Sequence, residues 1–293
     1  MNRQPHRQEV HAFLQKHFGI TYWDFAIPNG SGNETYFVNS NEQRYFIKIG
    51  VQIERYQAMD ALGLIPPVLL TGYLTDGVSI IVQAYIAGRT PSRKDFQTQL
   101  EQIATMISRT HHGAEVKRVL PEASSNTYRD LGLAVLTGIQ QRWEAYQAQV
   151  PEVAEFVEAS LADLHQQVQS FQGAGLVASH NDICNANWLL STDGQLYLLD
   201  LESMTRDDPA VDIGAMLWWY YPPELRSRFL AIAGYANDEA FQFRMRVRMA
   251  MHCLKITLPR EASFDTFDAA SFAQELTDFR AILAGQDNPQ GYA

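Results

Sequence analysis

The segment SHNDICNANWLLSTDGQLYLLDLES, residues 179–203, constrains the fold of this chain more than any other stretch. It holds two apolar, strand-like runs, NWLLS and QLYLL, separated by Thr-Asp-Gly. Asp-Gly between two such runs is a strong signal for a two-residue β-hairpin turn. With Asp193-Gly194 as that turn, Asn187 is expected directly opposite Asp200, with Cβ atoms about 4.5–5.5 Å apart. The hairpin therefore predicts an amide oxygen and a carboxylate that converge on one point.

The same segment carries a third polar group, Asp182, five residues before Asn187. Phosphoryl transfer from metal-bound ATP uses a carboxylate that accepts a hydroxyl proton, together with oxygen ligands that hold Mg²⁺. Asp182 is the candidate catalytic base, and Asn187 and Asp200 are the candidate Mg²⁺ ligands. The alternative is a polar loop beside an ordinary hairpin, since the HxDxxxxN pattern is short and such residues are common in loops. The upstream features below favour the catalytic interpretation.

Length and composition indicate a globular protein of two lobes rather than one. The chain has 293 residues, 46% of them hydrophobic and 19% charged, which is ordinary for a soluble fold with a large core. It has no apolar run long enough for a membrane helix, and the N-terminus lacks a signal-peptide core. Cys184 and Cys253 form neither a disulfide framework nor a zinc motif. We therefore expect a cytoplasmic protein without membrane association, of open oligomeric state.

Charge is distributed unevenly along the sequence. Residues 1–90 hold equal numbers of basic and acidic side chains, so the formal net charge of −10 belongs to residues 91–293. An acidic lobe argues against a nucleic-acid partner, which needs a basic surface. It favours a cationic substrate through the electrostatic field. The alternative is that these carboxylates belong to the site itself and to solvated helix faces.

The residue pattern predicts an α+β protein. Helices are expected at 5–18 and 51–63, and strands at 34–39, 43–49, 68–74 and 78–86. A linker is expected at 87–92, where Gly88 and Pro91 interrupt regular structure. Beyond it, apolar residues recur at helical spacing, and helices continue after residue 212 to about 284. The predicted domains are a small β-rich N-terminal lobe, 1–86, and a larger, mainly helical lobe, 87–293, with a hinge at about 83–91.

The N-terminal lobe contains candidate nucleotide-binding residues. Gly30, Gly32 and Asn33 lie in PNGSGNETYFV, just before a predicted strand, where glycines let the backbone approach phosphates. An ordinary hairpin turn is the alternative. Lys48 lies in the apolar strand YFIKI and could contact the α- and β-phosphates of ATP, unless it is an exposed strand lysine. Glu54, one turn into the next helix, could pair with Lys48, with Glu42 as the competing carboxylate.

These parts follow one another in the order found in kinases, and the chain is similar to the aminoglycoside phosphotransferase/choline kinase-like family of small-molecule kinases. His180, Asp182 and Asn187 match the family's HxDxxxxN motif, and Asp200 matches its metal-binding aspartate. His-Asn-Asp in place of His-Gly-Asp is similar to choline kinases and their bacterial relatives. The resemblance runs from the glycine loop to the helices beyond residue 212.

A second stretch carries the same resemblance. LDLESMTRDDPAVDIG, residues 199–214, resembles the family's DWE…GDPAxDL segment through Glu202, Asp208, Pro209 and Asp212. The resemblance implies a protein-kinase-like fold of two lobes. It implies ATP and Mg²⁺ as cofactors and a small hydroxyl-bearing acceptor.

The resemblance also implies roles for further residues. His180, which belongs with the catalytic residues, would brace the loop more than react, and Asp212 would support the loop. Residues 83–86, with Gln83, Tyr85 and Ile86, would form the hinge whose backbone meets adenine. Trp218–Tyr221 could offer a cation–π surface to a quaternary amine, although most of these aromatic residues are expected in the core.

The chain also departs from protein kinases. Asp200 is followed by Leu-Glu rather than by a DFG-type glycine, and Cys184 stands where protein kinases commonly carry lysine. Few residues separate Asp200 from Asp212, which leaves little space for a peptide-docking segment. The sequence thus predicts an ATP-dependent O-phosphotransferase acting on an amino alcohol such as choline or ethanolamine, or on an aminoglycoside-like molecule. A sugar-like acceptor, a catalytically silent nucleotide-binding protein and, third, a protein kinase are the alternatives.

Overall fold

The computed structural model describes residues 5–28, 34–40, 43–259 and 268–292. The chain folds into two compact units. Unit 1 comprises residues 1–90, 113–119 and 186–202, and unit 2 comprises residues 91–112, 120–185 and 203–293. The predicted lobe boundaries, 1–86 and 87–293 with a hinge at 83–91, stay a prediction.

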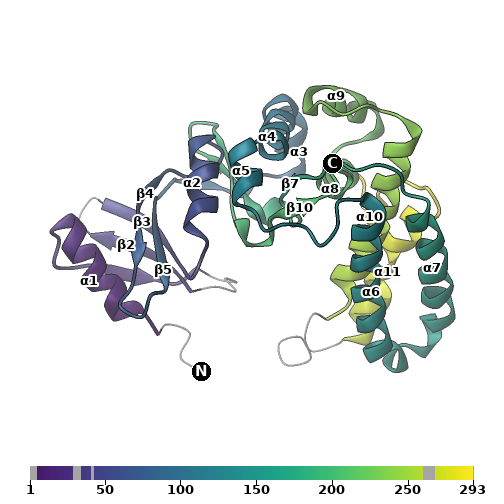
Figure 1. Ribbon diagram of the computed structural model, residues 1–293, viewed down its shortest axis with the longest axis horizontal. Coiled ribbons are helices and arrows are strands. Elements are labelled where there is room, and N and C mark those ends of the chain that lie inside the picture. Colours follow the sequence, from purple (N-terminus) through teal and green to yellow (C-terminus); the bar gives the residue numbers. More distant parts are fainter. Residues whose placement is uncertain (1–4, 29–33, 41–42, 260–267, 293) are drawn as a thin grey trace. The chain divides into compact units, whose positions relative to one another are not determined.

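Unit 1 consists mainly of β-strands (Figure 1). Its helices and strands are α1 (Arg7–Phe18), β1 (Asp24–Ala26), β2 (Thr35–Ser40), β3 (Gln43–Ile49), α2 (Ile53–Ala61), β4 (Val68–Tyr73), β5 (Ser79–Ala84), β6 (Gly88–Arg89), α5 (Ala114–Val119), β8 (Trp188–Ser191) and β9 (Leu196–Leu198). The 3₁₀ turns η2 (Asn185–Asn187) and η3 (Leu201–Ser203) flank the strand pair β8–β9. The predicted α+β class, with a small antiparallel sheet in the N-terminal region, is confirmed.

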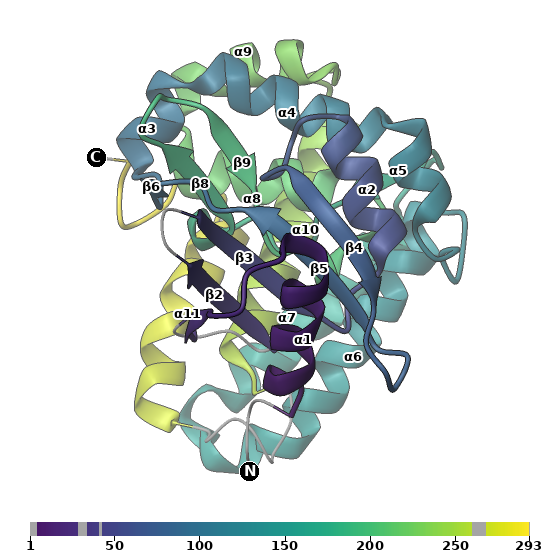
Figure 2. The same ribbon diagram turned by 90° about the vertical axis from the view of Figure 1, so that its left-hand side faces the viewer.

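The larger sheet of unit 1 has the order β1-β2-β3-β5-β4 in the described residues, with antiparallel neighbours. Helix α1 lies across one of its faces (Figure 2). Val10 and Leu14 of α1 are fully buried against Tyr36, Val38 and Ile47 of the sheet. Strand β2 is buried along most of its length, and β3 runs from exposed residues at its start to three buried residues, Ile47, Lys48 and Ile49, at its end.

The segment predicted as a linker contains a strand. Gly88–Arg89 forms β6 and pairs with β8, with Gly88 opposite Ser191. A Cβ on Gly88 would lie 2.4 Å from the Leu190 carbonyl oxygen, so glycine permits the close approach of the two backbones. The expected breaker thus serves a strand contact, and the hairpin β8–β9 becomes part of a three-stranded sheet of order β6-β8-β9 among the described residues.

The hairpin is present, but its predicted register is wrong by one residue. Trp188 pairs with Leu198, and the Leu199 amide donates to the Asn187 carbonyl oxygen at 2.8 Å, so Asn187 faces Leu199 rather than Asp200. The loop has three residues, Thr192 to Gly194, and Gly194 adopts φ +88°. Thr-Asp-Gly suits this loop because a three-residue hairpin commonly ends in a left-handed glycine. A one-residue slip moves every side chain to the other face of the sheet.

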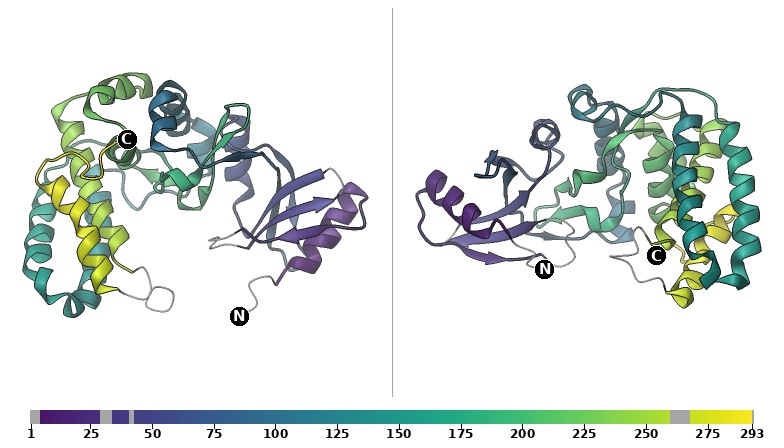
Figure 3. Two further views of the ribbon diagram at one scale, coloured as in Figure 1. Left: turned by 180° about the vertical axis from the view of Figure 1, so that it is seen from behind. Right: turned by 60° about the horizontal axis from the view of Figure 1, so that its bottom comes forward.

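Unit 2 is mainly helical. Its elements are α3 (Arg93–Thr98), α4 (Leu100–His112), α6 (Tyr128–Tyr146), η1 (Gln147–Gln149), α7 (Pro151–Gln169), β7 (Val177–Ser179), β10 (Thr205–Asp207), α8 (Ala210–Tyr220), α9 (Pro223–Ala233), α10 (Glu239–Thr257) and α11 (Ala269–Leu283). Helices α6, α7, α10 and α11 run side by side (Figure 3). The short pair β7–β10 brackets the segment of the predicted catalytic loop, because β7 ends at Ser179 and β10 begins at Thr205.

Candidate functional site

Lys48 is buried, with 7% of its surface exposed, and its ammonium lies between two carboxylates. Nζ donates to Asp200 Oδ1 at 2.9 Å and to both oxygens of Glu202 at 3.0 Å. Burial raises the pKa of Glu202, as does its hydrogen bond with Asp200, while the charge of Lys48 opposes the shift. Two close carboxylates in a low-dielectric setting favour a nearby cation. This cluster therefore concentrates negative charge around one fixed ammonium.

The predicted partner of Lys48, Glu54, is not the one in the structure. Glu54 is exposed on α2, and the ion pairs of Lys48 among the described residues go to Asp200 and Glu202. The rotation of α2 explains the difference, because the helix directs its neighbouring residues, Arg55 and Tyr56, toward the 200–202 turn.

Arg55 and Tyr56 fix the 200–202 turn to α2. Arg55 Nη1 donates to the carbonyl oxygens of Leu201 at 2.6 Å and Glu202 at 3.0 Å. The Tyr56 hydroxyl donates to Glu202 Oε1 at 2.8 Å, and burial raises the pKa of Tyr56. Tyr56 therefore remains a neutral donor at physiological pH. Arg55, Tyr56 and Glu202 were not predicted as site residues, although Glu202 was named in the family resemblance.

The two candidate metal ligands lie at the ends of the hairpin strands. Asn187 ends the η2 turn just before β8, and Asp200 follows β9, one residue beyond the partner of Asn187. Asp200 has φ +55° and its side chain is 50% exposed. A carboxylate and an amide oxygen are hard ligands of the type that Mg²⁺ binds, usually with phosphate oxygens completing its shell. The residues present thus fit a metal-bound nucleotide.

Among the described residues, two residues other than glycine have a positive φ. They are Asp200 and Asn181, the latter with φ +62°. Such residues cost of order 1–3 kcal/mol and cluster at functional sites. Asn181 directly precedes the candidate base, Asp182, and Asp200 is itself a candidate metal ligand. Backbone strain thus coincides with both halves of the predicted site.

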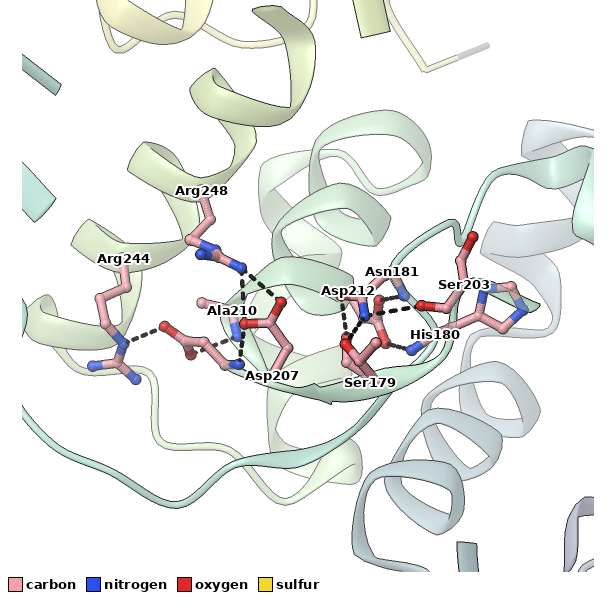
Figure 4. Close-up of polar contacts among 11 residues, drawn as sticks. Ser179, His180, Asn181, Ser203, Asp207, Ala210, Asp212, Arg244 and Arg248 are labelled. Atoms are coloured by element: carbon pink, nitrogen blue, oxygen red, sulfur yellow. Dashed lines mark hydrogen bonds and ion pairs between the residues drawn. The ribbon is translucent and has the colours of Figure 1, made fainter. Parts of the chain in front are cut away.

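The catalytic-loop segment of unit 2 is held by the buried carboxylate of Asp212 (Figure 4). Its oxygens accept from the backbone amides of His180 at 2.6 Å and Asn181 at 2.9 Å. His180 is fully buried, which suits a bracing role rather than direct chemistry, whereas Asp182 is partly exposed. The Asn181 side chain donates to the Ser203 carbonyl oxygen at 3.2 Å, so both edges of the loop are tied down.

Asp212 has a further buried partner, His111 of α4. His111 Nε2 lies 3.0 Å from Asp212 Oδ2, and its Nδ1 lies 2.6 Å from the Tyr235 hydroxyl. Although burial acts to raise the pKa of Asp212, the hydrogen bond and the charge of His111 outweigh it and the pKa is lowered. Asp212 is therefore an anion inside the protein, stabilised by the imidazole and by two backbone amides. His111 was not predicted as a site residue. In the sequence it is only a histidine in the last turn of a helix, which does not indicate a buried partner.

Two adjacent acidic residues at the end of β10 bind arginines of α10 (Figure 4). Arg248 Nη2 contacts both oxygens of Asp207, at 2.8 and 2.9 Å, and Arg244 Nε donates to Asp208 Oδ2 at 3.1 Å. Arg244 also lies over the Tyr128 ring at 4.4 Å. Burial raises the pKa of Asp208, against the attraction of Arg244. These pairs join the segment that precedes Asp212 to the helical part of unit 2.

The other predicted nucleotide residues are placed only in part. Gly30, Gly32 and Asn33 lie outside the described residues. Gln83 is buried inside the sheet and its side chain donates to the Pro66 carbonyl oxygen at 2.7 Å. Tyr85 and Ile86 follow the end of β5 at Ala84, and the Arg44 guanidinium lies 3.9 Å from the centre of the Tyr85 ring. The adenine contact of these residues stays a prediction.

The aromatic run at the end of α8 belongs mainly to the core. Trp218, Tyr220 and Tyr221 are buried, with exposed fractions of 9%, 6% and 0%, and Trp219 is half-buried. Gly214, Leu217 and Trp218 of α8 line a cavity of about 510 Å³ shared with α9, α10 and α11. Asn237 before α10 and the 285–287 turn complete the lining, to which the segment around Asp182 does not contribute.

The described residues contain neither a metal-binding cluster of three side chains nor a membrane-spanning helix. No group of three or more His, Cys, Asp or Glu side chains is arranged to hold a metal ion there. No helix within those ranges is both long and apolar enough to cross a membrane.

The sequence was compared with families of known proteins, and the structure with solved structures. The sequence model of the phosphotransferase enzyme family (APH) matches residues 26–245, three quarters of the chain. This range includes Lys48, the catalytic-loop segment, Asp200 and Asp212.

Solved structures with a similar fold cover nearly the whole chain. A choline/ethanolamine kinase family protein from Mesorhizobium loti is 18% identical, with TM-score 0.67, and the match covers 97% of this chain and 95% of the other. Spectinomycin phosphotransferase APH(9)-Ia, solved with ADP and spectinomycin, is 15% identical with TM-score 0.65, covering 96% and 99%. Choline kinase LicA from Streptococcus pneumoniae is 16% identical with TM-score 0.59, covering 94% and 99%. These matches confirm the predicted kinase-like fold.

Proposed function

Because the chain belongs to the phosphotransferase enzyme family, we propose that it transfers the γ-phosphate of ATP to a hydroxyl group of a small molecule. The observation that carries this proposal is the buried ammonium of Lys48, held at 2.9 Å from Asp200 and 3.0 Å from Glu202. Kinase sites use a strand lysine held by a carboxylate together with a metal-binding aspartate, and Lys48 lies beside carboxylates that can serve both purposes. The proposed co-substrate, ATP, is consistent with a cytoplasmic location.

Each residue has a distinct proposed role. Lys48 binds the α- and β-phosphates, and Asn187 and Asp200 bind Mg²⁺. Asp182 accepts the proton of the attacking hydroxyl, or at least orients that hydroxyl, while the buried His180 braces the loop. Bound Mg²⁺–ATP supplies the phosphoryl group and neutralises charge on its oxygens.

The remaining proposed contacts are with the nucleotide. The backbone at Gly30, Gly32 and Asn33 approaches the phosphates, where glycine removes the steric barrier. The segment of Gln83, Tyr85 and Ile86 meets adenine. Solved structures of similar fold contain ADP or AMP, which supports nucleotide binding as the shared function of this fold.

For the acceptor we propose a small cationic alcohol. The negative charge of residues 91–293 favours a cation through the electrostatic field. Structures of similar fold are described as choline or choline/ethanolamine kinases, and others as complexes with spectinomycin or kanamycin. These descriptions correspond to two acceptor classes, amino alcohols and aminoglycoside-like molecules.

An ADP-release screen tests the proposal. The protein with Mg²⁺–ATP is offered amino alcohols, aminoglycosides and neutral sugars in separate reactions, and phosphorylated products are identified by mass spectrometry. We expect acceptor-dependent ADP release with at least one cationic class and little with its uncharged analogue. Binding of Mg²⁺–ATP without turnover of any acceptor would contradict the proposal and indicate a catalytically silent nucleotide-binding protein.

A further inference from the structure

The hydroxyl of Tyr220 contacts the catalytic-loop segment at a point remote from the Asp212 carboxylate. The backbone amide of Asn185 donates to this hydroxyl at 2.6 Å. Tyr220 is 6% exposed and its ring stacks on Phe96, with ring centroids 4.1 Å apart and planes inclined by 16°. Burial and stacking on Phe96 hold the ring, and the hydrogen bond from Asn185 holds the hydroxyl.

Asp212 and Tyr220 belong to the same helix, α8. Asp212 accepts from the amides of His180 and Asn181 at the start of the loop segment, and Tyr220 accepts from Asn185 near its end. Eight residues separate them, which corresponds to about 12 Å along a helix axis. One rigid helix thus holds both ends of the segment that contains Asp182.

Between these two attachments the loop has one apolar attachment. Ile183 is 4% exposed, whereas Asp182 is partly exposed and Cys184 and Asn185 are exposed. The side chain of Ile183 is therefore anchored in the core, directly after the partly exposed Asp182. Because Asn185 itself is exposed, its amide is ordered by the buried hydroxyl beneath it rather than by burial of its own side chain.

We infer that Tyr220 is a positioning residue, which fixes the backbone at Asn185 and thereby the orientation of Asp182. This inference rests on the proposed function, because it assigns Asp182 a reacting proton. Burial raises the pKa of Tyr220, and the negative charge of Asp182 also contributes, so the two groups lie within electrostatic reach. The hydroxyl remains neutral at physiological pH and keeps a lone pair for the Asn185 amide.

The adjacent tyrosine supplies a matched control. Tyr221 is fully buried, and its hydroxyl donates to the Phe96 carbonyl oxygen at 2.9 Å. Tyr220→Phe and Tyr221→Phe each remove one buried, hydrogen-bonded hydroxyl and keep the ring. They differ in that only the first hydroxyl, of these two, contacts the loop. Any effect of lost packing or general destabilisation should therefore be shared by both variants.

The test combines amide hydrogen exchange with steady-state kinetics on the full chain. With Tyr220→Phe we expect exchange at the Asn185 amide to rise at least about tenfold, because a single hydrogen bond is lost. We expect kcat to fall about tenfold with the KM for Mg²⁺–ATP unchanged, since an orienting contact acts on the chemical step. Tyr221→Phe should change neither the exchange at Asn185 nor kcat.

Three outcomes would overturn the inference: unchanged exchange at Asn185 in Tyr220→Phe, raised exchange with unchanged kcat, or an equal loss of kcat in Tyr221→Phe. Failure of the proposed function has a different signature, which is absence of turnover by the unmodified protein. In that case the exchange measurement still decides whether Tyr220 fixes the loop.

Discussion

Lys48 Nζ lies 2.9 Å from Asp200 Oδ1, although the two residues are 152 positions apart in the sequence. Together with Glu202, they form a cluster in which two carboxylates share one buried ammonium. The cluster joins the proposed phosphate-binding cation, Lys48, to the proposed metal ligand, Asp200.

Replacing Lys48 by methionine should weaken nucleotide binding. Methionine keeps most of the side-chain volume but removes the charge, and a hydrogen bond to a charged group contributes about 1.5–3 kcal/mol. We expect the Kd for Mg²⁺–ADP, measured by calorimetry, to rise about 10- to 100-fold. Lys16→Met, at an exposed position of α1, is the matched control and should bind as the unmodified protein does. Equal affinity in both variants would exclude Lys48 from nucleotide binding.

Glu202 should make stability depend on pH. Its folded-state pKa is raised, chiefly by burial and next by the hydrogen bond with Asp200. Glu202 contributes fully to the free energy of unfolding below its unfolded-state pKa of about 4.3. This contribution is lost as the pH rises through the raised folded-state pKa. In Glu202→Gln this decline should disappear from urea-unfolding midpoints measured from pH 4 upward.

The control for Glu202 is Glu54→Gln, at an exposed position of α2. This variant should retain the pH dependence of the unmodified protein. A Glu202→Gln protein with the same slope as the Glu54→Gln protein would show that Glu202 is not protonated preferentially in the folded state.

Two helical glycines should respond oppositely to alanine. A Cβ at Gly214 in α8 would lie 3.0 Å from the Met245 carbonyl oxygen, whereas a Cβ at Gly138 in α6 meets no atom within 4 Å. Gly138→Ala should stabilise the protein by about 0.5–1 kcal/mol through helix propensity. Gly214→Ala should destabilise it by about 1–3 kcal/mol because α8 and α10 must separate. Chemical denaturation checks both, and a stabilised Gly214→Ala protein would contradict the close helix contact.

Asp212→Asn should be strongly destabilising. The buried carboxylate accepts from two backbone amides and contacts His111, and an amide side chain has only one accepting oxygen. Breaking such a buried ionic network typically costs about 3–5 kcal/mol. Asp163→Asn, at an exposed position of α7, should change the free energy of unfolding by less than about 0.5 kcal/mol. A loss below about 1 kcal/mol in Asp212→Asn would show that the network contributes little to stability.

Much of unit 1 could be predicted from sequence because its signals are local. The runs ETYFVN and QRYFIKI are rich in β-branched and aromatic residues, and the predicted strands 34–39 and 43–49 agree closely with β2 and β3. The candidate site residues could also be named from sequence, because Asp182 and Asn187 are close together and Asp200 follows a hairpin signal, and their roles stay a prediction. Local periodicity and contiguous motifs need no knowledge of tertiary contacts.

The partners of charged residues were harder to predict. Glu54 is the nearest helical carboxylate to Lys48 in sequence, but the packing of α2 turns Arg55 and Tyr56 inward instead. The hairpin register also depended on a choice between two-residue and three-residue loops that Thr-Asp-Gly allows equally. The register differs by one residue, so Asn187 lies opposite Leu199 instead of Asp200.

The spacing of two arginines in α10 is a sequence signal for buried ion pairs. Arg244 and Arg248 stand four residues apart, so they share one face of α10. Two cations on a buried stripe require anions, and Asp207-Asp208 is a nearby acidic pair in the motif region. The pairing itself spans about 40 residues and depends on how β10 packs against α10, which the sequence pattern does not show.

We expect Asp182 to act in phosphoryl transfer itself, and the decisive experiment separates the chemical step from nucleotide binding. Asp182→Asn and the Asp163→Asn control are compared for acceptor-dependent ADP release and for the Kd of Mg²⁺–ATP. Proton acceptance by a positioned side chain contributes typically 10²–10⁴-fold to rate. We predict that Asp182→Asn lowers kcat at least about 100-fold while the Kd stays within about twofold of the control. Equal turnover by the two proteins would exclude Asp182 as a catalytic residue.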